Sequence, residues 1–210
     1  MNRYVLKHLK GQYKRTRGEI EERLREFAGI DRDDVQRLFS ELCFCICTPQ
    51  TRARAAHRAV KRLEESQLLW HGDKSQISQL LASEGVRFPN VKAGYIVASR
   101  ARASSLPTYV RAGDGKSIRK TLMSCFPGLG MKEASHFLRN IGFIDVAILD
   151  RHVLRWMVRV GVIKRPPRSL TARRYMILER KFYRLSEIAG IPPAALDLVM
   201  WSAETGEVFK

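Results

Sequence analysis

Hydrophobic residues recur along most of the chain at intervals of three and four, which is the spacing of one face of an α-helix. The clearest series are Val35, Leu38, Phe39 and Leu42, and then Ala134, Phe137, Leu138 and Ile141. No stretch alternates apolar and polar residues over the length of a convincing strand, and no segment repeats. The pattern therefore predicts an all-α protein.

Prolines, glycines and polar clusters interrupt this pattern and separate the predicted helices. Helices are expected at residues 17–27, 31–47, 52–67, 74–83, 91–103, 117–125, 131–141, 150–160, 171–189 and 194–203. Loops are expected at residues 48–51, 85–90 and 107–115, and a stiff basic connector at residues 164–168. The first fifteen residues are basic and weakly patterned, so they either fray or pack against the C-terminal part of the chain.

The charge balance is strongly basic, with 38 Lys and Arg against 21 Asp and Glu and a net charge of +17. A polyanion is the default partner of such a surface, although a generally basic, heat-adapted surface would look the same. No stretch approaches the roughly 20 apolar residues that span a bilayer. The start, MNRYVLKHLK, has no apolar signal core. We therefore expect a protein without membrane partners that stays inside the cell.

The four cysteines do not predict a metal site. Cys43, Cys45 and Cys47 lie in one apolar helix, where 43 and 47 share a face and 45 points elsewhere. No further cluster of Cys or His completes a tetrahedral set, and Cys125 is isolated. Buried thiols in a reducing compartment are the expected role, with no metal and no cofactor.

Residues 126–160 carry the most informative motif. The turn Pro127-Gly128-Leu129-Gly130 joins the helix at residues 117–125 to a second helix, which glycine ends at position 142. This is a helix-hairpin-helix. A helix N-terminus that follows a glycine turn offers free backbone N–H groups and a positive dipole end, which suit a phosphate.

Two ionisable residues stand out near the hairpin. Lys132 lies two residues past the turn and, with His136 and Arg139, on the helix face opposite the apolar series. Asp150 follows eighteen residues later, at the N-cap position of the next long helix. Taken singly, a solvated lysine and a plain helix cap are the commoner roles. The combination of hairpin, lysine and aspartate is what indicates catalysis.

This order of hairpin, Lys132 and Asp150 resembles the helix-hairpin-helix–GPD superfamily of DNA glycosylases. The short chain, the RFPNVKAGYI stretch and the C-terminal lysine resemble the archaeal type 2 8-oxoguanine DNA glycosylase/lyases. The resemblance covers nearly the whole chain. It implies one all-α domain of two helical lobes, at about residues 36–125 and at residues 1–35 with 126–210, with an active-site cleft between them. Many superfamily members carry a four-cysteine loop near the C-terminus, whereas this chain has no cysteine after Cys125.

The resemblance also implies roles for single residues. Lys132 would attack C1′ of the damaged nucleotide, and Asp150 would stabilise the charge and accept a proton. An amine nucleophile leaves a Schiff base on the sugar and thereby allows β-elimination. Gln50 would be a wedge that enters the duplex when the base is flipped out. Without the resemblance, a glutamine in this position is more often an ordinary loop amide.

The damaged base would be held by three residues that the resemblance points to. Phe88 and Trp201 would sandwich it, and the C-terminal carboxylate of Lys210 would accept the hydrogen on N7. Guanine N7 is itself an acceptor in normal DNA, so an anion there favours 8-oxoguanine. Core packing for both aromatic residues, and a disordered terminus for Lys210, are the competing interpretations.

The predicted function is excision of 8-oxoguanine from duplex DNA followed by cleavage at the abasic site, by a monomer. Thr51 and Arg52 are expected to reach phosphate, as is the turn at residues 127–130. A non-catalytic helix-hairpin-helix DNA-binding module would share the hairpin and the charge without needing Lys132 and Asp150. A glycosylase for oxidised pyrimidines is a third possibility.

Overall fold

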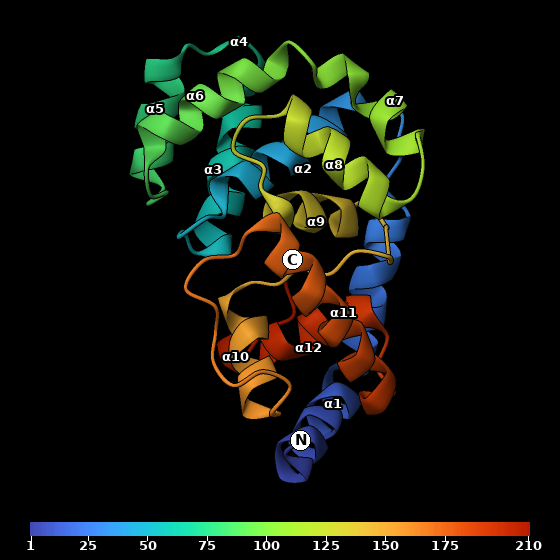
Figure 1. The fold of residues 1–210 in the computed structure, drawn as a ribbon. Helices are drawn as coiled ribbons and strands as arrows, with labels where there is room; N and C mark the ends of the chain where they lie inside the picture. The colour runs from blue at the N-terminus through green and yellow to red at the C-terminus, as the bar shows by residue number, and fades with distance from the viewer. The chain divides into compact units, whose positions relative to one another are not determined.

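The computed structural model describes residues 1–210, and it contains twelve α-helices, one 3-10 helix and no strand (Figure 1). The all-α prediction is confirmed. The chain divides into two compact units. Ile30–Ile141 forms the central unit, and Met1–Gly29 with Gly142–Lys210 forms the terminal unit. None of the helices combines the length and the apolar character that crossing a bilayer requires.

The central unit is built around one buried helix. Its elements are α2 (Val35–Cys47), α3 (Ala53–Glu65), α4 (Leu68–His71), α5 (Lys74–Ser83), α6 (Pro89–Arg100), η1 (Ala103–Ser105), α7 (Leu106–Arg111), α8 (Gly115–Cys125) and α9 (Met131–Asn140). Helix α2 packs against α3, α6, α7 and α9, and every residue from Leu38 to Cys47 is buried (Figure 1). The end of this helix, the FCIC run, is apolar on every face, as enclosure by other helices favours.

Local capping signals fix most helix ends at or near the predicted residues. Asp34 begins α2 by accepting a hydrogen bond from the Arg37 N–H, three residues later than expected. The predicted start, Asp31, forms a turn instead and accepts from the Asp33 N–H. Helix α2 ends before Pro49, as predicted from the conformational restriction that proline imposes on its predecessor.

The loop predicted at residues 107–115 is wrong. Residues 106–111 form helix α7, because Pro107 lies in its first turn, where the missing N–H has no helical partner to lose. Gly115 begins α8, and Asp114 caps that helix by accepting from the Ser117 N–H at 2.8 Å. Proline and glycine therefore mark helix starts here and not a loop.

The terminal unit packs three helices around a fourth. It consists of α1 (Arg3–Ala28), α10 (Arg151–Arg159), α11 (Ala172–Ala189) and α12 (Pro193–Thr205). Helix α12 contacts the other three and is buried from Ala194 to Met200. The first residues do not fray: Leu6 and Leu9 are buried, α1 packs on α12, and the Asn2 N–H donates to Val160 O at 2.7 Å.

The boundaries of the two units differ from those of the two lobes that the sequence predicted. The hairpin and α9 belong to the central unit, whereas the sequence placed residues 126–141 with the termini. The physical reason is packing, because α9 contacts α2 and α8 within the central unit. Lys132 therefore lies in the central unit and Asp150 in the terminal unit.

Candidate active site

The hairpin turn between α8 and α9 accepts only glycine at its centre. Gly128 has φ +84°, and a Cβ there would lie 2.5 Å from Cδ2 of Tyr95 on α6. Leu129 is buried beneath the turn, whereas Pro127 is half-buried. Close packing of Tyr95 on the glycine therefore holds the hairpin turn against α6.

Gly130 is the N-cap of α9, and its N–H is not free. It donates to Oε2 of Glu133 at 3.3 Å, as in a capping box. Open N–H groups were predicted at this helix start, and no role for Glu133. A glutamate at the third position of a helix that begins after a turn is the signal that would have identified it.

Lys132 lies in the first turn of α9 with 21% of its side chain exposed. Its Nζ donates to the Thr48 hydroxyl at 3.3 Å and pairs with Oε1 of Glu133 at 3.1 Å. The amine is thus held by one residue of its own helix and by one at the end of α2. It is neither a freely solvated lysine nor a buried one.

His136 and Arg139, which the sequence placed on the same helix face as Lys132, do not share its exposure to solvent. Both are buried, with 7% and 4% exposed, because α9 packs against α2 on one side and α8 on another. The ring of His136 meets the ring of Phe44 edge-on at 5.5 Å. Only the first turn of α9, with Lys132 and Glu133, reaches solvent.

The joint between α2 and α3 has Gln50 at its tip. Gln50 is exposed and has φ +56°, a left-handed conformation that is uncommon outside glycine. The next residue, Thr51, is partly buried, and its hydroxyl has partners within the protein. The hydroxyl oxygen of Thr51 accepts from the Arg87 N–H at 3.1 Å and from Nζ of Lys92 at 2.9 Å. Arg52 is exposed at the N-cap of α3.

Phe88 is 50% exposed and has φ +58°, immediately before the first residue of α6. An aromatic residue half in solvent does not plug the core, so that alternative is wrong. The guanidinium of Arg87 lies 5.5 Å from the centre of its ring. Only three non-glycine residues have positive φ, and Gln50 and Phe88 are two of them. Such strain gathers at functional sites.

Lys92 is the second residue that the sequence analysis missed. It is 4% exposed on α6, and its Nζ donates to Cys47 O and Pro49 O, both at 2.8 Å, as well as to Thr51. Burial lowers the pKa of Lys92 to about 8, and the cation of Lys132 acts in the same direction. Within the central unit, these contacts bring together the joint at residues 48–51, the start of α6 and the start of α9.

Asp150 lies in the terminal unit as the N-cap of α10, where the sequence predicted it. Oδ1 accepts from the N–H groups of His152 and Val153, both at 2.8 Å. The cap uses only this oxygen of the carboxylate. The segment before Asp150 is anchored to α11, because Tyr175 accepts from the Leu149 N–H and Glu179 accepts from the Ala147 N–H.

The C-terminus folds back beside α12. Trp201 is partly exposed, and its ring lies 6.3 Å from that of Phe209, which is buried at 6% exposure. Lys210 itself is half-buried. The interpretation of Trp201 as mere core packing and that of a loose terminus are therefore weakened. Trp201 and Lys210 share the terminal unit with Asp150.

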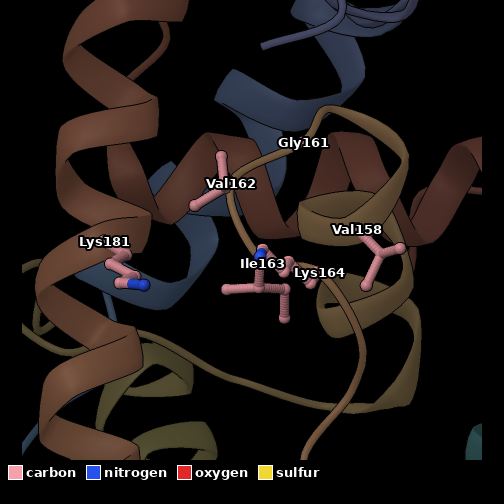
Figure 2. Close-up of a pocket in the computed structure, with 6 residues that line it drawn as sticks. All are labelled: Val158, Gly161, Val162, Ile163, Lys164 and Lys181. Carbon is pink, nitrogen blue, oxygen red and sulfur yellow. The ribbon is translucent and has the colours of Figure 1, made fainter.

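An open depression on the terminal unit offers no chemistry of this kind (Figure 2). Its lining consists of Val158, Gly161, Val162, Ile163, Lys164 and Lys181. The turn after α10 forms most of it, and Lys181 reaches it from α11 (Figure 2). It contains no carboxylate, imidazole or thiol.

Comparison with known proteins agrees with these features. Residues 20–191 match the family model described as 8-oxoguanine DNA glycosylase. The chain is 37% identical, over 91% of both sequences, to an 8-oxoguanine DNA glycosylase/AP lyase of Thermoplasma volcanium.

Two solved structures are also similar over nearly their full length. The 8-oxoguanine DNA glycosylase of Thermotoga maritima has a TM-score of 0.91, with 34% identity and 99% of both chains covered. The 8-oxoguanine glycosylase/lyase of Methanocaldococcus jannaschii, crystallised with a 15mer DNA containing 8-oxoguanine, has a TM-score of 0.89 and 30% identity, covering 97% of this chain and 100% of that one. The similarity extends over nearly the whole chain and agrees with the hairpin, Lys132 and Asp150. The chain therefore belongs to the 8-oxoguanine DNA glycosylase family.

Proposed function

We propose that this protein removes 8-oxoguanine from duplex DNA and then cleaves the resulting abasic site. The observation that carries the proposal is the partly exposed amine of Lys132, held by Thr48 and Glu133 in the first turn after the hairpin. A non-catalytic DNA-binding module needs no such amine. Membership of the glycosylase family supports the same function.

The reaction begins when the damaged nucleotide leaves the base stack. Gln50 enters the space that the base vacates, and its exposed position at the tip of the joint supports this role. Phe88 stacks on the extruded base, and Trp201 covers its other face. Stacking of a base on an aromatic side chain is worth about 1–3 kcal/mol. Arg52 and the turn at residues 127–130 bind phosphate.

Lys132 then acts as the nucleophile. Its amine gives up a proton and attacks C1′, and the glycosidic bond breaks with its electron pair leaving on the base, which takes up a proton. Asp150 stabilises positive charge on the sugar and accepts the proton. Since its N-cap bonds use only Oδ1, the second oxygen remains for this task. Opening of the sugar ring gives an iminium, and loss of a 2′ proton then expels the 3′ phosphate.

Selectivity for the oxidised base comes from the C-terminal carboxylate of Lys210. 8-Oxoguanine carries a hydrogen on N7, whereas guanine presents a lone pair there. A buried repulsive or unmet contact costs on the order of 1–3 kcal/mol. The folding of Phe209 into the terminal unit supports an ordered carboxylate at this position.

Borohydride trapping tests the proposal directly. Reduction of the iminium joins enzyme and DNA permanently, so wild-type protein should form a covalent adduct on an 8-oxoguanine duplex. Lys132→Gln should form none. Normal trapping by that variant would show that another amine is the nucleophile, and absence of strand cleavage by the wild-type protein would favour a binding module.

The protein acts as a monomer, which light scattering over a range of concentrations would test. It works on chromosomal DNA inside the cell, as its net charge of +17 favours. Competition between 8-oxoguanine and oxidised pyrimidine duplexes would decide the lesion class.

A further inference from the structure

Lys92 is a buried cation for which the proposed chemistry has no use. It lies on α6, four residues after Phe88, with 4% of the residue exposed. Burial of a charged amine is costly unless hydrogen bonds satisfy it. Here its Nζ has oxygen partners at 2.8, 2.8 and 2.9 Å.

All three partners belong to the joint that presents Gln50. They are the carbonyl oxygens of Cys47 and Pro49 and the hydroxyl oxygen of Thr51. An ammonium has three N–H donors, so its capacity matches this set, whereas a neutral amine has only two. Lys92 therefore ties the end of α2 and both neighbours of Gln50 to one point on α6.

The same joint contacts the two segments that carry Phe88 and the nucleophile. The Arg87 N–H, one residue before Phe88, donates to the Thr51 hydroxyl at 3.1 Å. The backbone N–H of Lys92 donates to Phe88 O at 3.1 Å. On the other side, Lys132 donates to Thr48 at 3.3 Å.

Gln50 and Phe88 both need such a support. Each has positive φ, which costs on the order of 1–3 kcal/mol for a residue with a side chain and persists only where its surroundings enforce it. Neither side chain is held by burial, because Gln50 is exposed and Phe88 is half-exposed. The contacts around Lys92 fix the backbone at Pro49 and Thr51, on both sides of Gln50, and at Phe88.

We propose that Lys92 is a positioning residue for base extrusion, which holds the wedge Gln50 and the stacking residue Phe88 in register with Lys132 through the joint at residues 47–51. The inference rests on the proposed roles of Gln50 and Phe88. Lys92 itself does not react, because its amine is enclosed and all of its donors are engaged.

The test compares two steps that depend to different degrees on the positions of Gln50 and Phe88 relative to Lys132. Excision of 8-oxoguanine requires extrusion and stacking of a base, whereas β-elimination at a preformed abasic site has no base to extrude. Lys92→Met should lower single-turnover excision on the order of a hundredfold, the effect of a small misplacement. Its lyase rate at the abasic site should stay within about twofold. Lys61→Met, an exposed lysine of α3, is the matched control and should change neither rate.

A purely structural role would lower both rates together, and equal losses in Lys92→Met would overturn the inference. Unchanged excision would overturn it too. If Lys92→Met does not fold, Thr51→Val decides, because it removes one acceptor of Lys92 and the link to Arg87 while leaving the cation in place. It should show the same selective loss of excision, to a smaller extent.

Gln50→Ala separates this inference from the function on which it rests. If Gln50→Ala leaves excision unchanged, the wedge itself is wrong, whatever Lys92 does. If Gln50→Ala lowers excision and Lys92→Met does not, only the positioning role fails. If both lower it, the double variant should lose less than the product of the single losses, because the two residues then act through one element.

Discussion

Two lysines of the central unit have different surroundings, which suit them to different roles. Lys132, at the start of α9, keeps 21% of its side chain exposed and has a hydroxyl and a carboxylate as partners. Lys92, on α6, is enclosed by three neutral oxygens. An amine that reacts needs access and few bonds to break, whereas an amine that positions needs the opposite. Both connect to the same joint at residues 47–51.

The largest expected effect is on covalent trapping, which should depend on Lys132 and not on Lys92. Lys132→Gln should abolish the borohydride-trapped adduct at a preformed abasic site, because it removes the amine that forms the iminium. Lys92→Met should trap at nearly the wild-type level at the same site. Gel separation of free and covalently bound DNA measures both. The comparison breaks if Lys92→Met loses trapping or if Lys132→Gln retains it.

The next effect concerns the hairpin turn between α8 and α9, which packs against Tyr95 of α6. Gly128→Ala places a Cβ 2.5 Å from Tyr95 in a left-handed conformation, and should lower the free energy of unfolding by about 2–3 kcal/mol. Gly85→Ala is the matched control, since Gly85 has φ +76° and no atom within 4 Å of the added Cβ. It should cost only about 1 kcal/mol, for the backbone conformation alone. Urea unfolding followed by circular dichroism gives both values, and equal losses would show that the contact with Tyr95 is unimportant.

Local signals explain how much of this arrangement the sequence could predict. The apolar periodicity, the N-cap at Asp150 and the glycine turn are properties of a few neighbouring residues, and the structure has them where expected. Lys92 carries no such signal, because its partners lie 41–45 residues away along the chain. A lysine in a helix looks solvated until the packing of α6 on α2 is known.

The faces of α9 illustrate the same limit. Its apolar series predicted one buried face, and all four of those residues are buried. The opposite face carries His136 and Arg139, for which the apolar periodicity predicted no burial. Contact with both α2 and α8 buries them as well. The roles of Gln50, Phe88, Trp201 and Lys210 stay predictions, since their test is a measurement on DNA.

A variant of Glu133 tests how the amine of Lys132 is held. Glu133→Ala removes both the ion pair with Lys132 and the acceptor for the Gly130 N–H. The amine then loses its orientation, and excision and abasic-site cleavage should fall together by about tenfold, equivalent to about 1.4 kcal/mol. Glu133→Gln is the control, because its amide oxygen still caps Gly130, and it should retain most of the stability that the alanine variant loses. If Glu133→Ala lowers excision but leaves abasic-site cleavage unchanged, Glu133 is a positioning residue for base extrusion, as proposed for Lys92.

The smallest expected effect is a dependence of stability on pH that only the enclosed lysine produces. The pKa of Lys92 is lowered to about 8, from an ordinary value near 10.5, chiefly by burial. Between these values the unfolded chain binds the proton and the native protein does not, so the free energy of unfolding rises with pH. The wild-type protein should gain about 1 kcal/mol relative to Lys92→Met between pH 8 and pH 9.

Urea unfolding of both proteins at several pH values measures this gain, because groups that do not interact with Lys92 cancel in the difference. Below about pH 7 the difference should become flat, since Lys92 is then protonated in both states. Lys61→Met, whose lysine is exposed, should follow the wild-type protein at every pH. A difference between wild type and Lys92→Met that stays constant from pH 7 to pH 10 would mean that the three oxygens offset the cost of burial completely. Lys92 would then hold the joint as a permanent cation throughout the range in which the enzyme works.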